Sequence, residues 1–144
     1  MSRKEYKYSQ LAGKVIGCAM NVHSTLGNGF QEVIYKRVLE IELSDELISF
    51  SREKEMSIFY KGRMIGSRRV DFLVGNVVAV ELKAIIQLED VHLAQAINYL
   101  EAYNLEIGLL LNFGARSLQV KRVLNRKFRL PPHRKPSPNE NLEK

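Results

Sequence analysis

The chain has 144 residues, of which 45% are hydrophobic and 26% are charged. This ordinary composition predicts one globular domain with its own core. The apolar runs are too short to cross a bilayer, and the polar N-terminal residues lack the apolar segment of a signal peptide. The lone cysteine, Cys18, has no intramolecular disulfide partner and is expected to be a buried thiol. Together these features predict a cytoplasmic protein with no membrane partner.

The net charge of +6 is concentrated near the C-terminus. Residues 1–114 contain 13 Lys or Arg and 14 Asp or Glu (net −1), whereas residues 115–144 contain 9 and 2 (net +7). We expect a single domain over residues 1–125, followed by a basic, proline-containing and flexible tail over residues 126–144. A polyanion partner and a solubilising segment explain this charge equally well.

Two helices are predicted at the start of the chain, over residues 8–26 and about 30–47, because apolar residues recur there at helical spacing. The run Gly27-Asn28-Gly29 separates them. The apolar stripes expected to face the core are Leu11, Val15, Cys18 and Val22 in the first helix and Val33, Ile34, Val38, Ile41 and Leu43 in the second.

Strands are predicted next, over residues 52–60, 63–74 and 77–83, with turns at Lys61-Gly62 and Gly75-Asn76. A helix over residues 90–103, a strand over 107–111 and a further strand over 118–124 follow. This order predicts an α/β fold, a three-layer-like sandwich around a mixed central sheet. The apolar start of strand 77–83 predicts that it lies in the centre of the sheet.

Three charged residues lie on the two strands that flank the Gly75-Asn76 turn. Glu81 and Lys83 point to one face of their strand because side chains alternate. A hairpin centred between Gly75 and Asn76 places residue 71 opposite residue 80, and a slight offset brings Asp71 beside Glu81. The sequence therefore predicts a cluster of Asp71, Glu81 and Lys83 at one end of the sheet.

Such a cluster suits the hydrolysis of a phosphodiester bond. Two carboxylates favour a hard divalent cation such as Mg²⁺ or Mn²⁺, and Lys83 can orient a water or stabilise charge on the phosphate. The alternative is a structural one, in which the charges pair with each other or reach solvent at the sheet edge.

The arrangement of Asp71 and Glu81-Leu82-Lys83 resembles the signature of the PD-(D/E)XK nuclease superfamily, whose core is restriction-endonuclease-like. The run from Gly29 to Tyr35 is similar to the G-x-x-E-x-x-Y motif of one family within it. Residues 69–72 and 95–100 also resemble blocks of that family, and the resemblance spans about residues 10–125. Val70 stands where the superfamily name has proline.

The resemblance implies a role for each matching residue. Asp71, Glu81 and the backbone carbonyl of Leu82 would be metal ligands, and Lys83 would be the catalytic lysine. Glu32 would be a further acidic member, for a second cation or a water, although the dipole at a helix N-terminus explains a glutamate there equally well. Gln95 would complete the site.

The basic residues gain a role if the site is a nuclease. Seven of them are expected to contact a nucleic-acid backbone without reading its sequence. They are Arg68, Arg69, Lys121, Arg122, Arg126, Lys127 and Arg129.

The leading hypothesis is a Mg²⁺- or Mn²⁺-dependent nuclease that acts on DNA rather than RNA, with a homodimer as one assembly. A non-catalytic nucleic-acid- or protein-binding module with the same fold is the second hypothesis. A toxin-like or accessory component regulated by a partner is the third.

Overall fold

The computed structural model describes residues 3–130, with side chains from Tyr8 onward. This part of the chain contains every helix and strand that the sequence predicts. Some limits differ by a few residues. The elements in chain order are α1 (Arg3–Leu26), α2 (Glu32–Asp45), β1 (Phe50–Tyr60), β2 (Arg63–Val74), β3 (Val78–Lys83), α3 (Asp90–Tyr103), β4 (Ile107–Asn112) and β5 (Gln119–Leu124).

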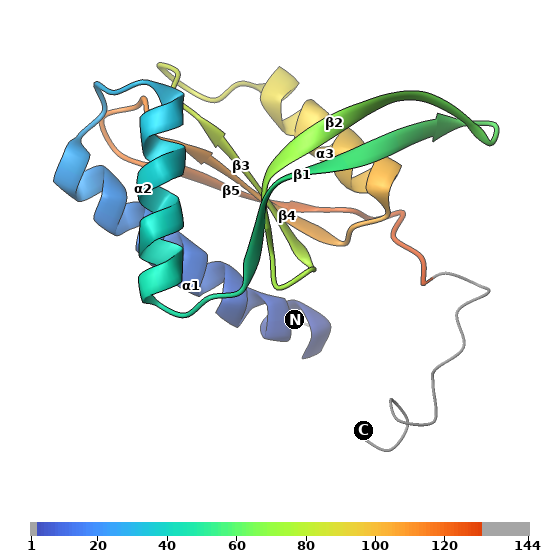
Figure 1. The fold of residues 1–144 in the computed structure, drawn as a ribbon, viewed down its shortest axis with the longest axis horizontal. Coiled ribbons are helices and arrows are strands. Elements are labelled where there is room, and N and C mark those ends of the chain that lie inside the picture. Colours follow the sequence, from blue (N-terminus) through green and yellow to red (C-terminus); the bar gives the residue numbers. More distant parts are fainter. Residues whose placement is uncertain (1–2, 131–144) are drawn as a thin grey trace.

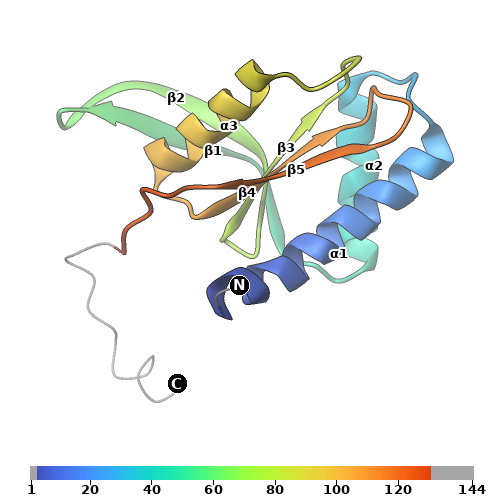
Figure 2. The same ribbon diagram turned by 180° about the vertical axis from the view of Figure 1, so that it is seen from behind.

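The five strands form one mixed sheet in the order β1-β2-β3-β4-β5. Strands β3 and β4 are parallel, and the other neighbours are antiparallel. Helices α1 and α2 cover one face of the sheet and α3 covers the other, as the two opposite views show (Figure 1, Figure 2). The predicted α/β sandwich around a mixed sheet is therefore confirmed, and β3 lies at its centre.

The larger core lies between the sheet and the pair α1 and α2. Helix α2 buries Tyr35, Leu39 and Leu43, which recur every four residues. The predicted stripe for this helix was partly wrong, because Val33 is 38% exposed and Ile41 is 59% exposed. The large ring of Tyr35 sets which side of the helix faces the sheet, since it stacks on Phe113 with the ring centroids 4.8 Å apart.

The turn between β2 and β3 differs by one residue from the predicted register. Phe72 pairs with Val80 and Val74 with Val78. Asp71 and Glu81 therefore occupy the next pair of opposed positions, just beyond the end of the ladder. Gly75 and Asn76 both have positive φ, and the N–H of Val77 donates to the carbonyl of Val74. Val77 is then left outside the ladder, which gives the one-residue offset that brings the two carboxylates together.

The hairpin of β1 and β2 extends well beyond the rest of the sheet (Figure 1). The two strands pair from Phe50 and Val74 out to Tyr60 and Arg63, whereas β2 pairs with β3 only over residues 72–74. Beyond Asp71 the hairpin is therefore a two-stranded arm. Within the described residues, none of the helices combines the length and apolar character needed to cross a membrane.

Candidate active site

Asp71 lies where β2 and β3 separate. The ladder between these strands ends at Phe72 and Val80, and the N–H of Leu82 donates instead to Asp71 Oδ2 at 2.8 Å. The carboxylate thus takes the place of a backbone acceptor, which keeps a buried N–H satisfied. Asp71 is only 9% exposed, and it occupies the point where the two strands diverge.

Lys36 of α2, which is not among the site residues predicted from the sequence, reaches the same carboxylate from the side of the sheet that α2 covers. Its Nζ lies 2.9 Å from Asp71 Oδ1 and 3.0 Å from Glu32 Oε2. Burial alone lowers the pKa of Lys36, but hydrogen bonds to Asp71 and Glu32 outweigh burial and raise the pKa above its ordinary value. The i, i+4 spacing of Glu32 and Lys36 was the available signal, because these positions adjoin on a helix.

Tyr35 anchors the segment that precedes Glu32. Its hydroxyl donates to the carbonyl of Gly27 at 2.7 Å and accepts from the N–H of Phe30 at 3.1 Å. The ring is fully buried. This residue therefore ties the loop between α1 and α2 to the core and fixes the start of the helix that carries Glu32 and Lys36.

Glu81 is 8% exposed and lines the α3 side of the sheet, while its carboxyl group remains within hydrogen-bonding reach of Asp71. Burial first, and then the negative charge of Asp71, raise the pKa of Glu81 to about 8. Arg68 and Lys83 oppose this effect but do not cancel it. The guanidinium of Arg68 lies 3.8 Å from Glu81 and stacks on the Tyr99 ring at 3.7 Å.

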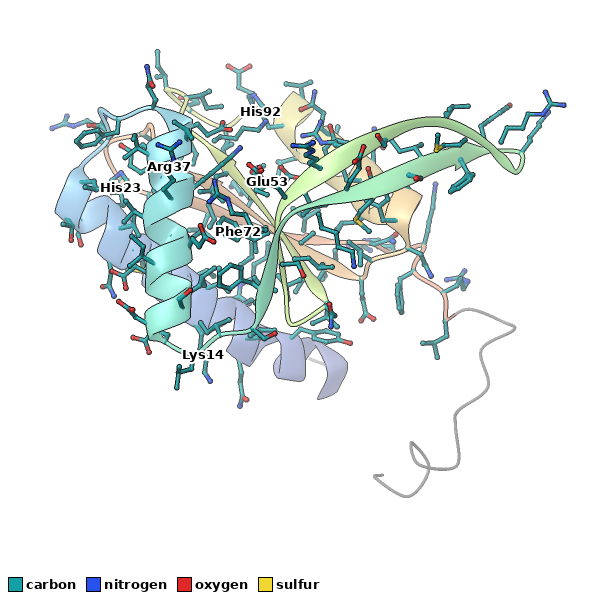
Figure 3. All side chains as sticks on the ribbon, in the orientation of Figure 1. Lys14, His23, Arg37, Glu53, Phe72 and His92 are labelled. Atoms are coloured by element: carbon teal, nitrogen blue, oxygen red, sulfur yellow. The ribbon has the colours of Figure 1, made fainter. Side chains whose placement is uncertain are left out.

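A small hollow between the sheet and α3 brings several predicted residues together. Arg68, Glu81, Lys83, Gln95 and Tyr99 line it, along with His92 and two apolar side chains. His92 lies at the start of α3, where its Nδ1 accepts the N–H of Glu89 at 2.9 Å and completes a helix cap (Figure 3). Gln95 is exposed at the mouth of this hollow.

Asn112, also unidentified from the sequence, fixes the loop that follows Lys83. This fully buried side chain accepts the N–H of Ile85 at 3.0 Å and donates to the carbonyl of the same residue at 3.0 Å. It also contacts Gln119, whose Oε1 accepts the N–H of Leu88 at 2.8 Å. The network holds residues 85–88 against β4 and β5 and so supports the end of the strand that carries Lys83.

The seven basic residues predicted to contact nucleic acid lie in three places. Arg68 lines the hollow, while Arg69 is exposed on β2. Lys121 and Arg122 are exposed on the edge strand β5, and Lys121 pairs with Leu110, which in turn pairs with Glu81. Arg126, Lys127 and Arg129 lie beside the end of α3, where Lys127 is 3.4 Å from Glu101 and the N–H of Arg129 donates to Asn104. The rest of the predicted tail, residues 131–144, lies outside the described residues.

The donor atoms of the site fit a hard divalent cation. Two carboxylates and the carbonyl of Leu82 are oxygen donors of the kind that Mg²⁺ and Mn²⁺ prefer. Among the described side chains there is no group of three or more His, Cys, Asp or Glu that would enclose an ion. The pair thus suits an ion that takes its remaining ligands from water and from a substrate phosphate.

These features define an α/β domain with an acidic pair and a lysine on two diverging strands. The sequence model of the PD-(D/E)XK nuclease superfamily matches residues 9–123, and the chain belongs to this superfamily. A solved structure described as SSO0001 is similar to it, with a TM-score of 0.53 and 19% sequence identity. The match covers 85% of this chain and 60% of that one, and it supports the fold alone. No match is found among curated proteins.

Proposed function

We propose that the protein is a divalent-metal-dependent nuclease that hydrolyses phosphodiester bonds in DNA. The observation that carries the proposal is the position of Asp71. Its carboxylate lies where β2 and β3 part, receives the N–H of Leu82, and adjoins the buried Glu81. Two adjacent buried carboxylates are costly unless a cation neutralises them, so this arrangement favours an ion there.

Each residue of the site has a proposed task. Asp71, Glu81 and the carbonyl of Leu82 would hold Mg²⁺ or Mn²⁺, which, when bound, polarises the scissile phosphate and makes a nearby water more acidic. Lys83 would orient the attacking water and stabilise negative charge that develops on the phosphate. Glu32, which Lys36 links to Asp71, would position a second cation or a water. Gln95, which lines the hollow, would complete the site.

A non-catalytic binding module is the second candidate, and one observation favours it. Lys36 already pairs with Asp71, and Arg68 lies near Glu81, so side-chain cations offset part of the negative charge. A cluster of this kind can serve the fold without binding a metal.

The decisive experiment combines Mn²⁺ titration with cleavage assays on plasmid, linear duplex and single-stranded DNA. The wild type should bind Mn²⁺ and cleave at least one substrate. Asp71→Asn, Glu81→Gln and Lys83→Ala should each lower the cleavage rate about 100-fold or more, by analogy with the loss of other charge-stabilising groups. The first two changes should also weaken Mn²⁺ binding, whereas Lys83→Ala should leave it near the wild-type value.

Glu55→Gln provides the matched control, because Glu55 is an exposed carboxylate on β1 that accepts a hydrogen bond from the Ser67 hydroxyl. It should cleave and bind Mn²⁺ as the wild type does. If the wild type binds no divalent ion and cuts none of the three substrates, the second candidate replaces the first. Cleavage that survives Glu81→Gln and Lys83→Ala would show that the site lies elsewhere.

Several finer assignments belong to the same proposal. Membership of the GxxExxY family is supported by the motif residues Gly29, Glu32 and Tyr35. Glu32 contacts Lys36 at the candidate site, and Tyr35 anchors the loop between α1 and α2. The single reduced thiol of Cys18 is consistent with a cytoplasmic location. A homodimer is one assembly we expect, and the domain limits at residues 125 and 126 remain a prediction.

A further inference from the structure

The outer part of the β1–β2 hairpin, residues 57–67, exposes an unusual number of large apolar side chains. We call this segment the distal hairpin. Phe59, Tyr60, Met64 and Ile65 are each between 61% and 66% exposed. Met56, the residue that precedes the distal hairpin on β1, packs against the α3 side of the sheet. An isolated two-stranded arm gains little stability from such residues, so their grouping at one tip favours a role in contacting a partner.

The charge of the distal hairpin has one sign. Residues 57–67 contain Lys61 and Arg63 and no Asp or Glu. Nearer the sheet, Arg69 pairs with Glu55 across the strands. Lys61 Nζ lies 5.5 Å from the centroid of the Tyr60 ring, so a positive charge and an aromatic face lie together at the tip. A polyanion that also presents flat rings complements both features.

The strand register links the tip to the candidate active site. Directly opposed residues of an antiparallel pair share a face, and these pairs are Met56 with Arg68, Ile58 with Gly66, and Tyr60 with Arg63. Alternation along β1 places all three pairs on the same face. Arg68 contacts Tyr99 and Glu81, so this face runs from the hollow to the tip, about 15 Å away by strand geometry.

We propose that the distal hairpin is a nucleic-acid-binding arm that holds a strand with unpaired bases. Lys61 and Arg63 contact its phosphates, and the Tyr60 ring, on the face that leads to the hollow, stacks on a base. The inference rests on the proposed nuclease function, because the nucleic acid that the arm holds is the substrate that would be cleaved at the hollow. Single-stranded nucleic acid fits better than an intact duplex, since the exposed rings need free base faces.

Binding is measured in EDTA with a fluorescent single-stranded oligonucleotide and a matched duplex, so that no cleavage occurs. The wild type should bind the single strand more tightly than the duplex. Arg63→Ala should weaken binding several-fold and reduce the slope of log K against log salt concentration by about 1. Tyr60→Ala should weaken single-strand binding about tenfold and leave that slope unchanged, whereas Phe59→Ala, on the opposite face of the hairpin, should bind as the wild type does.

Lys14→Ala is the matched control, because it removes one exposed positive charge from α1, away from the hairpin (Figure 3). It should bind as the wild type does. Equal binding by Lys14→Ala, Arg63→Ala and Tyr60→Ala would overturn the proposal. So would a wild-type dimer that Tyr60→Ala converts to monomers, because the arm would then hold a second copy.

The two proposals fail in different ways. If the wild type binds through the hairpin in EDTA but never cleaves with Mn²⁺, the arm is correct and the nuclease function is not. If it cleaves and the hairpin variants cleave and bind as the wild type does, the nuclease function is correct and the arm is not. Thermal unfolding of each variant should match the wild type, since the substituted side chains are exposed.

Discussion

The two halves of β2 belong to one strand, yet their surroundings differ completely. Residues 70–74 are all buried, and the core clusters on the two faces of the sheet include Val70, Phe72 and Val74. In residues 63–69, most side chains are exposed, and the only neighbouring strand is β1. Asp71 lies at the inner side of this boundary, where β3 departs. The inner half therefore holds the candidate metal ligand Asp71 rigidly, and the outer half is free to contact a large partner.

This difference has a physical origin in the number of layers around the strand. A buried strand places its side chains within close-packed neighbours, so small changes in it are costly. A two-stranded arm has little apolar area to lose, so its residues are selected by what they contact outside the fold. Because the candidate site lies at the boundary between the two halves of β2, its residues are held by the packed core and remain close to an accessible surface.

The largest expected effect comes from truncating an aromatic residue in the inner half. Phe72 is fully buried and contacts Phe50 with the ring centroids 5.6 Å apart. Phe72→Ala should lower the free energy of unfolding by about 3–5 kcal/mol in urea titrations. Phe59→Ala in the outer half should change it by less than about 0.5 kcal/mol. Similar losses for the two variants would contradict the difference between the halves.

The second prediction concerns the pH dependence of stability without divalent metal. The pKa of Glu81 is about 8 in the folded protein, against its usual value of 4.5. Between these values the folded state binds more protons than the unfolded state, so the free energy of unfolding should fall as the pH rises through this window. At pH 9, Glu81→Gln should be more stable than the wild type by on the order of a few kcal/mol.

The exposed carboxylate of Glu55 supplies the control for this measurement. Glu55→Gln should retain the wild-type fall in stability between pH 4.5 and 8, and Glu81→Gln should lose most of it. A wild-type curve that stays flat across this window in EDTA would show that Asp71 and Glu81 do not share one buried environment.

A smaller effect is expected from Lys36, the helix residue that bridges Asp71 and Glu32. Lys36→Met should lower the metal-free free energy of unfolding by about 1–3 kcal/mol, because Asp71 loses its ion-pair partner. Mn²⁺ should then stabilise this variant more than the wild type, since the ion no longer shares Asp71 with an ammonium group. Thermal unfolding with and without Mn²⁺ measures both changes.

Lys61→Met removes a lysine from the outer half and is the comparison for Lys36→Met. It should leave both the metal-free stability and the response to Mn²⁺ unchanged. A response to Mn²⁺ in Lys36→Met no greater than in the wild type would show that Lys36 and the cation do not compete for Asp71.

Local patterns in the chain were sufficient to predict most of the architecture. The change from helical spacing to strands and the turn residues at Gly75-Asn76 are encoded within short segments, so each element could be recognised alone. The central place of β3 followed from its apolar opening run. The pairing of Asp71 with Glu81 was predicted only through an assumed offset, because the backbone conformation of Gly75 and Asn76 decides the register.

Residues that act across the fold were harder to recognise. Lys36 meets Asp71 although 35 positions separate them in the sequence, and Asn112 holds a loop 27 residues away. Nothing in their local sequence specifies those partners. The inner face of α2 was likewise misjudged, since Tyr35 packs inward on Phe113 while Ile41 faces solvent. Such choices depend on the shape of the facing surface, which a single helix does not contain.

The sequence by itself determined the type and order of the elements and the presence of Asp71, Glu81 and Lys83 on neighbouring strands. These properties depend on side-chain periodicity and turn chemistry, which act over a few residues. Only the tertiary structure decided that β2 leaves β3 at Asp71, that Lys36 and Arg68 lie beside the two carboxylates, and that the distal hairpin projects from the sheet. These depend on which surfaces pack together, because burial and charge pairing join residues far apart in the chain.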